Sequence, residues 1–293
     1  MPINSSTAAT VNLRPDLGAF FEFDLELEKQ GFVANKVFPI VDVSLQADNP
    51  GKMPLEQLLF NGDTSRASGS GYNRGNWSFE RYTYATEEHG WEEPVDDRDR
   101  VRYSAILQAE AIATMRAQSV IARNYETRVA DAVFNTSTWT GSGLTTAVTN
   151  EWDDASNATP IVDVEAAVQK VYDGSGLKAN ALVCNWKVFR NLRNCDEVID
   201  RINSAGAGDA SKASDVTTAM LEQVFDLDYV IVAGASKNSA NEGQSASVSQ
   251  IWSDEYAMVC RVSDSIDPRD PCIGRTFHFS ADGSALDGVI EQY

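Results

Sequence analysis

The sequence Asp63-Thr-Ser-Arg-Ala-Ser-Gly-Ser-Gly-Tyr-Asn-Arg-Gly75, rich in Gly, Ser and Arg, belongs to the most informative part of this chain. It is followed by Trp77-Ser-Phe-Glu-Arg-Tyr-Thr-Tyr84, in which aromatic and polar residues alternate. Residues 97–134 then contain neither Pro nor Gly, and their apolar residues recur at helical spacing. The stretch from Met53 to Phe134 therefore predicts a long polar hairpin that leads into one long helix. Such a projecting hairpin suits a protein that assembles by extending over its neighbouring subunits.

The hairpin carries candidate contact residues. A two-stranded hairpin alone is barely stable in water, so we expect this one to gain order by packing on a partner. The glycines at 69, 71 and 75 lack the spacing of a phosphate-binding GxGxxG loop and indicate a hairpin tip instead. The intersubunit contacts predicted here are Arg66, Arg74, Trp77, Phe79, Tyr82 and Tyr84.

Residues 1 to about 30 have the pattern of an arm that lies on a surface of this subunit or another. The run Phe20-Phe-Glu-Phe-Asp-Leu-Glu-Leu27 alternates apolar with acidic residues, as in an extended segment with one covered face. The further contact candidates are Phe20, Phe21 and Phe23. The next run, Lys36-Val-Phe-Pro-Ile-Val-Asp-Val43, predicts a strand with Pro39 at an edge or a bulge.

An acidic cluster precedes the long helix, which would span roughly 55 Å over 97–134. It consists of Glu87, Glu88, Glu92, Glu93, Asp96, Asp97 and Asp99, with His89 among them. A metal site is one interpretation, but the carboxylates lack a ligand spacing and no second histidine lies near. The alternative is that Asp96 or Asp97 caps the helix and the other acids complement its dipole. We therefore predict neither a metal nor a cofactor.

The composition is that of a folded protein, with 43% hydrophobic and 23% charged residues. The net charge of −19 argues against a sequence-reading nucleic-acid module, which needs clustered Lys and Arg. No apolar run is long enough for a membrane span, and the N-terminus does not have the pattern of a secretory signal. The four cysteines show no CxxC pairing and indicate reduced, mostly buried thiols.

From about residue 159 the pattern becomes α/β. Thr159 and Pro160 predict a helix that runs through Tyr172 and ends in the Asp173–Gly176 turn. The expected strands are 181–184, 229–233, 248–252, 256–260 and 272–279, and the expected further helices are a short one capped by Asn185 and one over 217–225. The last strand alternates and must pair with an earlier one.

The chain shows no motif of a conventional enzyme. There is no GxSxG elbow, Walker A loop, HExxH or EF-hand, and neither histidine lies in a catalytic pattern. His278, between Phe277 and Phe279, is expected to face outward from its strand. We therefore predict that the protein is not an enzyme.

The order of segments resembles the HK97-type major capsid proteins of tailed bacteriophages. Local patterns that support the resemblance are Tyr229-Val-Ile-Val-Ala233, Ile251-Trp-Ser-Asp254 and Pro271-Cys-Ile-Gly-Arg-Thr276. The resemblance implies an α+β fold in four parts. They are an N-terminal arm with the first strand (1–40), an extended β-hairpin loop (41–96), a peripheral domain (97–154 and 262–293) with a spine helix over 97–134, and an α/β axial domain (155–261).

The resemblance also implies a virion subunit that forms pentamers and hexamers around double-stranded DNA, without reading its sequence. A separate scaffolding protein and a portal are expected partners, a decoration protein is left open, and no membrane is involved. Lys52 is the only lysine between Lys36 and Lys170, so we do not expect cross-linking through the hairpin tip. The alternatives are an encapsulin-like compartment, a virion accessory protein, and a soluble α/β enzyme whose loop is a lid.

Overall fold

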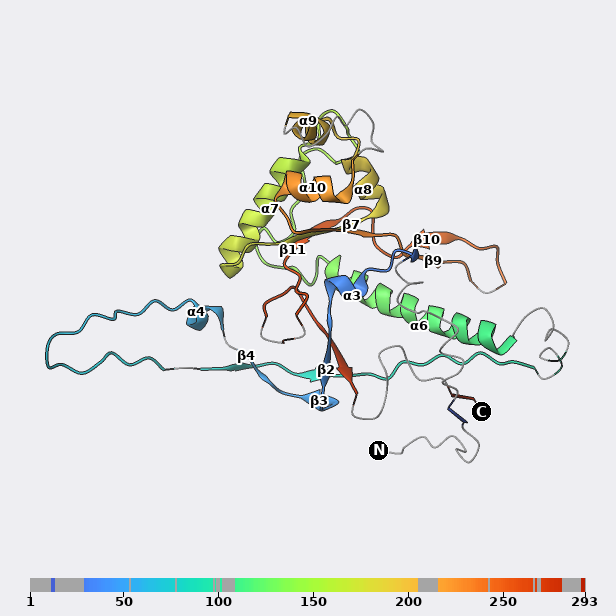
Figure 1. Ribbon diagram of the computed structural model, residues 1–293, viewed down its shortest axis with the longest axis horizontal. Coiled ribbons are helices and arrows are strands. Elements are labelled where there is room, and N and C mark those ends of the chain that lie inside the picture. The colour runs from blue at the N-terminus through green and yellow to red at the C-terminus, as the bar shows by residue number, and fades with distance from the viewer. Residues whose placement is uncertain are drawn as a thin grey trace.

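The computed structural model describes residues 12–13, 29–52, 54–76, 78–96, 98, 101, 109–204, 216–241, 243–265, 267, 270–280 and 291–292. Figure 1 shows a small sheet covered by helices, the long helix α6 (Ala109–Val133) crossing below it, and a loop that projects to one side. The fold is thus a mixture of helices and strands, in agreement with the α+β class.

The central sheet has three strands in the order β11-β7-β8. β7 (Ala181–Asn185) pairs in parallel with β8 (Tyr229–Ala233) and antiparallel with β11 (Ala257–Cys260). Every residue of β7 is buried, as in a strand that is covered on both faces. Because side chains alternate along a strand, Leu182 enters the core on one face and Val183 the core on the other.

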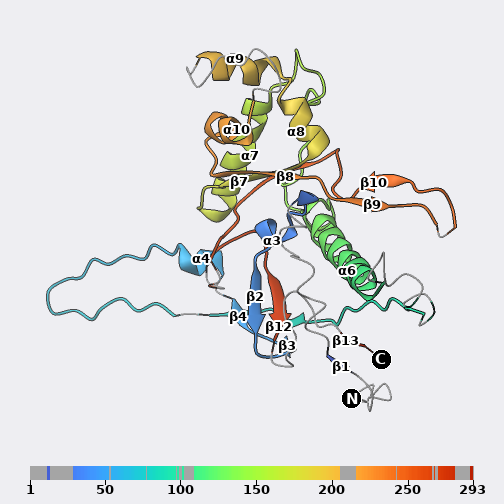
Figure 2. The ribbon, with the colours of Figure 1, turned by 45° about the vertical axis from the view of Figure 1, so that its right-hand side comes forward.

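Four helices contribute to the core on the first face, above the sheet in Figure 2. They are α7 (Pro160–Ser175), α8 (Trp186–Leu192), α9 (Asp196–Ser204) and α10 (Thr218–Phe225). Local signals fix their ends. The side chain of Asn185 accepts the backbone N–H of Lys187 at 2.7 Å and caps α8. Gly176 ends α7 in the left-handed conformation with φ of 71°.

The second face of the sheet packs on α3 (Ala34–Val37) and on the C-terminal turns of α6. Val37 and Val133 are fully buried there beside Trp252, whose ring meets Phe134 edge-on with centroids 5.2 Å apart. The 25 residues of α6 span about 37 Å. Residues 98 and 101 are also helical, and the rest of 97–108 lies outside the described residues.

A parallel pair of strands joins an early segment of the chain to a late one. β2 (Ile40–Val43) pairs with β12 (Thr276–Phe279), so the predicted late strand does return to an early one. The hydroxyls of Tyr125 on α6 and Thr276 lie 2.8 Å apart and tie the pair to the helix. The remaining pairs are antiparallel: β1 (Asn12–Leu13) with β13 (Glu291–Gln292), β3 (Ala47–Asp48) with β6 (Tyr84–Ala85), β4 (Gly51–Lys52) with β5 (Glu80–Arg81), and β9 (Ser236–Asn238) with β10 (Val248–Gln250).

The structure corrects several predicted elements. The run 36–43 is not one strand, because α3 continues to Val37 and β2 begins only at Ile40. The late strands are shorter than predicted, since β10 ends at Gln250, β11 begins at Ala257 and β12 begins at Thr276. α7 runs through the expected turn to Ser175, and α4 (Leu55–Leu58) and α9 are not predicted from the sequence.

His278 faces the same side of the β2–β12 pair as the exposed Asp42, in agreement with its predicted outward orientation. Its side chain is 20% exposed, and its Nδ1 lies 2.8 Å from Asp42 Oδ1.

The cysteines are free, with Cys184, Cys195 and Cys260 buried and Cys272 half-buried, as the sequence predicts. Burial raises the pKa of Cys184 and of Cys260 to about 12 each. No helix in the described part of the chain is long and apolar enough to cross a membrane.

Candidate interface for subunit assembly

The projecting loop is the segment between β4 and β5, and a short ladder of paired strands forms its base. Ala47 and Asp48 pair with Ala85 and Tyr84, and the ladder continues through β4 and β5. Beyond it the described residues form only the helical turn α4 and no further strand (Figure 1). Both limbs therefore leave the body of the subunit without the backbone pairing that would stabilise them.

The tip of the loop is held by its own polar contacts. The carboxylate of Asp63 accepts hydrogen bonds from the backbone and the hydroxyl of Ser65 at 2.8 and 3.0 Å, and these bonds lower the pKa of Asp63. The amide of Asn73 donates to the backbone oxygen of Asp63 at 2.8 Å, which joins the two limbs. The guanidinium of Arg66 lies 4.3 Å from the ring centre of Tyr72.

Large apolar side chains on this loop remain open to solvent. The exposed fractions are 59% for Leu59, 73% for Phe60, 78% for Tyr72, 63% for Phe79 and 41% for Tyr82. Aromatic side chains gathered on one exposed segment mark a surface that another protein covers. The loop therefore has the chemistry of an interface, with aromatic anchors and an arginine-bearing tip.

The predicted contact residues fall into three groups. Phe79, Tyr82 and the tip arginines Arg66 and Arg74 are exposed and free to meet a partner surface. Tyr84 instead packs within its own subunit: its ring lies 4.8 Å from that of Phe277, and its hydroxyl donates to the oxygen of Leu45 at 3.1 Å. The last group, Phe20, Phe21, Phe23 and Trp77, lies outside the described residues.

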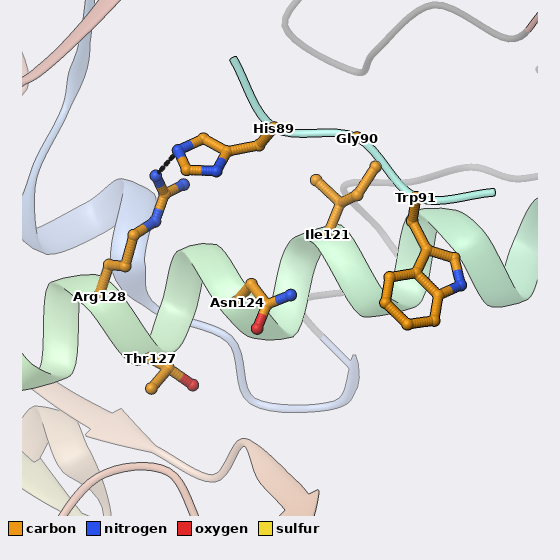
Figure 3. A pocket seen from close by; sticks show the side chains of 7 residues that line it. All are labelled: His89, Gly90, Trp91, Ile121, Asn124, Thr127 and Arg128. Atoms are coloured by element: carbon orange, nitrogen blue, oxygen red, sulfur yellow. Dashed lines mark hydrogen bonds between the residues drawn. The ribbon is translucent and has the colours of Figure 1, made fainter. Parts of the chain in front are cut away.

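The return limb of the loop follows α6 (Figure 3). A guanidinium nitrogen of Arg128 contacts Nε2 of His89, and Arg116 pairs with Glu93 at 3.5 Å. Between these contacts lies a hollow of about 290 Å³, lined by His89, Gly90, Trp91, Ile121, Asn124, Thr127 and Arg128. These contacts fix the limb against the helix, so the loop and α6 form one connected unit.

The acidic cluster behaves partly as a cap. The carboxylate of Asp96 accepts the backbone N–H of Arg98 at 2.8 Å, as predicted for a residue at a helix start. Asp97 and Asp99 lie outside the described residues. Within the described ranges, no group of three or more His, Cys, Asp or Glu side chains is placed to hold a metal ion.

A buried carboxylate that sequence reasoning missed joins three parts of the subunit. Glu126 on α6 is 1% exposed. It accepts the backbone N–H groups of Val33 and Ala34 at 2.9 and 3.0 Å and the indole N–H of Trp252 at 2.6 Å. Burial raises the pKa of Glu126, and the three hydrogen bonds oppose that shift. The only signal in the sequence is a charged residue within the apolar stripe of the helix.

Residues 30 and 31, which precede the segment bound by Glu126, are also closely packed against α6 and the residues after β8. The backbone N–H of Gly234 donates to the oxygen of Gly31 at 3.0 Å. A Cβ at Gly31, whose φ is +76°, would lie 2.8 Å from the Cα of Gly234. The side chain of Arg123 donates to Gln30 Oε1 at 3.4 Å and to the oxygen of Ser236 at 3.2 Å. The N-terminal segment is therefore locked to α6 and to the end of β8 where it joins the body.

Comparison with known proteins gives one sequence relative and one fold relative of note. No protein-family model matches the chain. A major capsid protein of Pseudomonas phage JBD67 is 26% identical over 231 residues, which is 78% of this chain and 72% of that protein. A phage-related protein from Bordetella bronchiseptica RB50 superposes with a TM-score of 0.63 at 17% identity, over 93% of this chain and 85% of that one. By sequence this chain is therefore a relative of a bacteriophage major capsid protein, and by structure it shares the fold of a phage-related protein.

Proposed function

We propose that this chain is the structural subunit of an icosahedral bacteriophage head, which self-assembles into pentamers and hexamers and encloses double-stranded DNA. The observation that carries the proposal is the projecting loop (Figure 1), on which Phe60, Tyr72, Phe79 and Tyr82 are exposed in the described part of the subunit. An arm that lies over a neighbour buries a large area without a globular interface. The relationship to a phage major capsid protein supports the same reading.

The proposed arrangement is of the HK97 type. Residues 1–40 form the arm and first strand, and residues 41–96 form the extended loop. Residues 97–154 and 262–293 form the peripheral domain, with α6 as the described part of the spine helix, and residues 155–261 form the axial domain around the β11-β7-β8 sheet. Support comes from the β2–β12 pair, which brings residues 40–43 beside residues 276–279, and from the contacts of the return limb with α6.

The partners follow from this role. We infer a separate scaffolding protein, a portal and packaged DNA, with a decoration protein as a further candidate and the virion as the location. The net charge of −19 argues against tight binding to DNA, because like charges repel at short range. No catalytic role is proposed.

Deleting residues 63–75 tests the proposal. The deleted segment contains the contacts among Asp63, Ser65 and Asn73, so the ladder at the base of the loop stays intact. We expect the variant to keep the circular dichroism of the full chain but to form no particles in electron microscopy or sedimentation. Phe79→Ser should weaken assembly, and Phe79→Leu, which keeps an apolar side chain, is the matched control. Particles of normal size from the deletion variant would refute the role of the loop.

Particle contents separate a phage head from an encapsulin-like compartment. Particles from infected or producing cells should protect genome-length DNA from nuclease. Particles that contain a protein cargo and no DNA would favour the compartment. A full-length chain that stays monomeric at all concentrations would contradict both.

A further inference from the structure

We propose that Asn61 is a site of spontaneous deamidation, at which the side-chain amide is lost through a succinimide formed with the backbone nitrogen of Gly62. Asn61 is exposed and lies in irregular backbone between α4 and the tip of the projecting loop. The pair Asn61-Gly62 is the one Asn-Gly sequence in the chain. The proposal does not rest on assembly, since it concerns the chemistry of the free loop.

The reaction balances without any oxidant or cofactor. Hydroxide removes the proton from the backbone nitrogen of Gly62, and that nitrogen attacks Cγ of Asn61. The new C–N bond closes a five-membered imide and the bond from Cγ to Nδ2 breaks. Nδ2 takes a proton from water and leaves as ammonia, which regenerates the hydroxide. Water then opens the imide at either carbonyl and gives aspartate or isoaspartate. The net change is the exchange of one ammonia for one water.

Local backbone decides which Asx-Gly pairs can react. Ring closure needs the backbone to rotate until Cγ reaches the next nitrogen, and a glycine at that position offers the least steric resistance. The pair Asp173-Gly174 lies inside α7, where ψ is held at the helical value. Its carboxylate also accepts a hydrogen bond from Gln169 at 2.6 Å. Asn61 and Gly62 lie in neither a helix nor a strand, so their backbone can rotate for succinimide formation, whereas the backbone of Asp173 in α7 cannot.

The surroundings of Gly62 support the assignment. A Cβ added to Gly62 would lie 2.7 Å from Cε1 of Phe60, so a side chain here would have to displace that ring. The carboxylate of Asp63 is already occupied by Ser65, which leaves solvent hydroxide as the base and makes the rate rise with pH. Each event adds one negative charge to a chain of net charge −19. The isoaspartate product also inserts a methylene into the backbone at the root of the tip.

Peptide mass spectrometry of the incubated full-length chain tests the proposal. Cleavage after Lys52 and after Arg66 yields a peptide in which Asn61 is the only asparagine. We expect the deamidated fraction of this peptide to grow with time and faster at higher pH. Asn157 is the internal reference, because its amide donates to Asp154 at 2.8 Å and its next residue is alanine.

Two variants serve as matched controls. Asn61→Gln should abolish the fast signal, and Gly62→Ala should slow it several-fold, since Phe60 is exposed and its ring can move. Both changes lie on an exposed loop and leave the cores intact. Deamidation of Asn61 no faster than that of Asn157, or an unchanged rate in Gly62→Ala, would overturn the proposal. Failure of the chain to assemble would leave these rates unaffected, so the two proposals are tested separately.

Discussion

Removing the carboxylate of Glu126 should destabilise the subunit more than any change at an exposed position of the same helix. Glu126→Ala leaves three buried donors, the backbone N–H groups of Val33 and Ala34 and the indole of Trp252, without their acceptor. Each buried donor that loses its partner costs about 1–3 kcal/mol. Relief from burying a charge offsets part of that sum. We therefore expect the free energy of unfolding to fall by about 3–5 kcal/mol, the range for a broken buried polar network.

The assay is urea unfolding of the unassembled full-length chain, followed by circular dichroism and by tryptophan fluorescence, with refolding checked. Glu126→Gln keeps one acceptor oxygen but turns an NH₂ group toward a donor, so its loss should be smaller, about 1–3 kcal/mol. Asp131→Ala, an exposed carboxylate on α6, is the control and should stay within about 0.5 kcal/mol of the parent. A loss in Glu126→Ala no larger than in Asp131→Ala would refute the reasoning.

The same site predicts a pH dependence. Burial raises the pKa of Glu126 above its ordinary value of 4.5, so the folded chain holds this proton more tightly than the unfolded chain. The contribution of Glu126 to stability is then largest below pH 4.5 and falls as the pH rises through the folded pKa. The difference in unfolding free energy between the parent and Glu126→Gln should therefore shrink over that window. A difference that grows with pH would show that the hydrogen bonds outweigh burial.

Three further changes give sharp outcomes. Asn185→Ala removes the cap of α8 and also the hydrogen bonds that the buried Asn185 amide donates to Trp252 and Gln250, so in urea titrations the free energy of unfolding should fall by more than the roughly 1–2 kcal/mol of a cap alone. An unchanged value would show that these bonds do not contribute to stability. Gly31→Ala forces a side chain into left-handed backbone against Gly234, and the strain alone should cost about 1–3 kcal/mol in the same titration; a stable variant would contradict the close approach. A thiol reagent should modify half-buried Cys272 first in the native chain. Cys184, whose pKa burial raises to about 12, should react only on unfolding. Modification of the Cys184 thiol in the native chain as fast as that of Cys272 would contradict its burial.

Local patterns predict the sheet well because its signals are adjacent in sequence. The strand 229–233 matches β8 at both ends, Asn185 caps α8 as the sequence indicates, and the helix predicted over 217–225 forms as α10 over 218–225. The hairpin is also confirmed at its base, where alternating residues form the ladder. These elements depend on side chains within a few positions of one another.

Contacts across long sequence separations are what the sequence does not reveal. Glu126 meets partners 92, 93 and 126 positions away, and its hydrogen bonds stabilise a helical turn at α3 that the β-prone residues around Pro39 argue against. Tyr84 has the pattern of an outward-facing hairpin residue, but Phe277 covers it from the far end of the chain. A charge or an aromatic ring gives no indication of its partner until the topology brings the two together.

The parallel pairing of β2 with β12 has a consequence for the order in which the subunit is made. Residues 40–43 leave the ribosome early, and their partners at 276–279 follow only after more than two hundred further residues. The sheet around β7 can close before then, whereas β2 waits with an open edge, a site prone to wrong pairing. Because β3 and the hairpin base follow β2 directly, the strand pair at the base of the projecting loop is completed late in synthesis. In a nascent chain the base of the projecting loop therefore stays incomplete until the rest of the subunit has had time to fold.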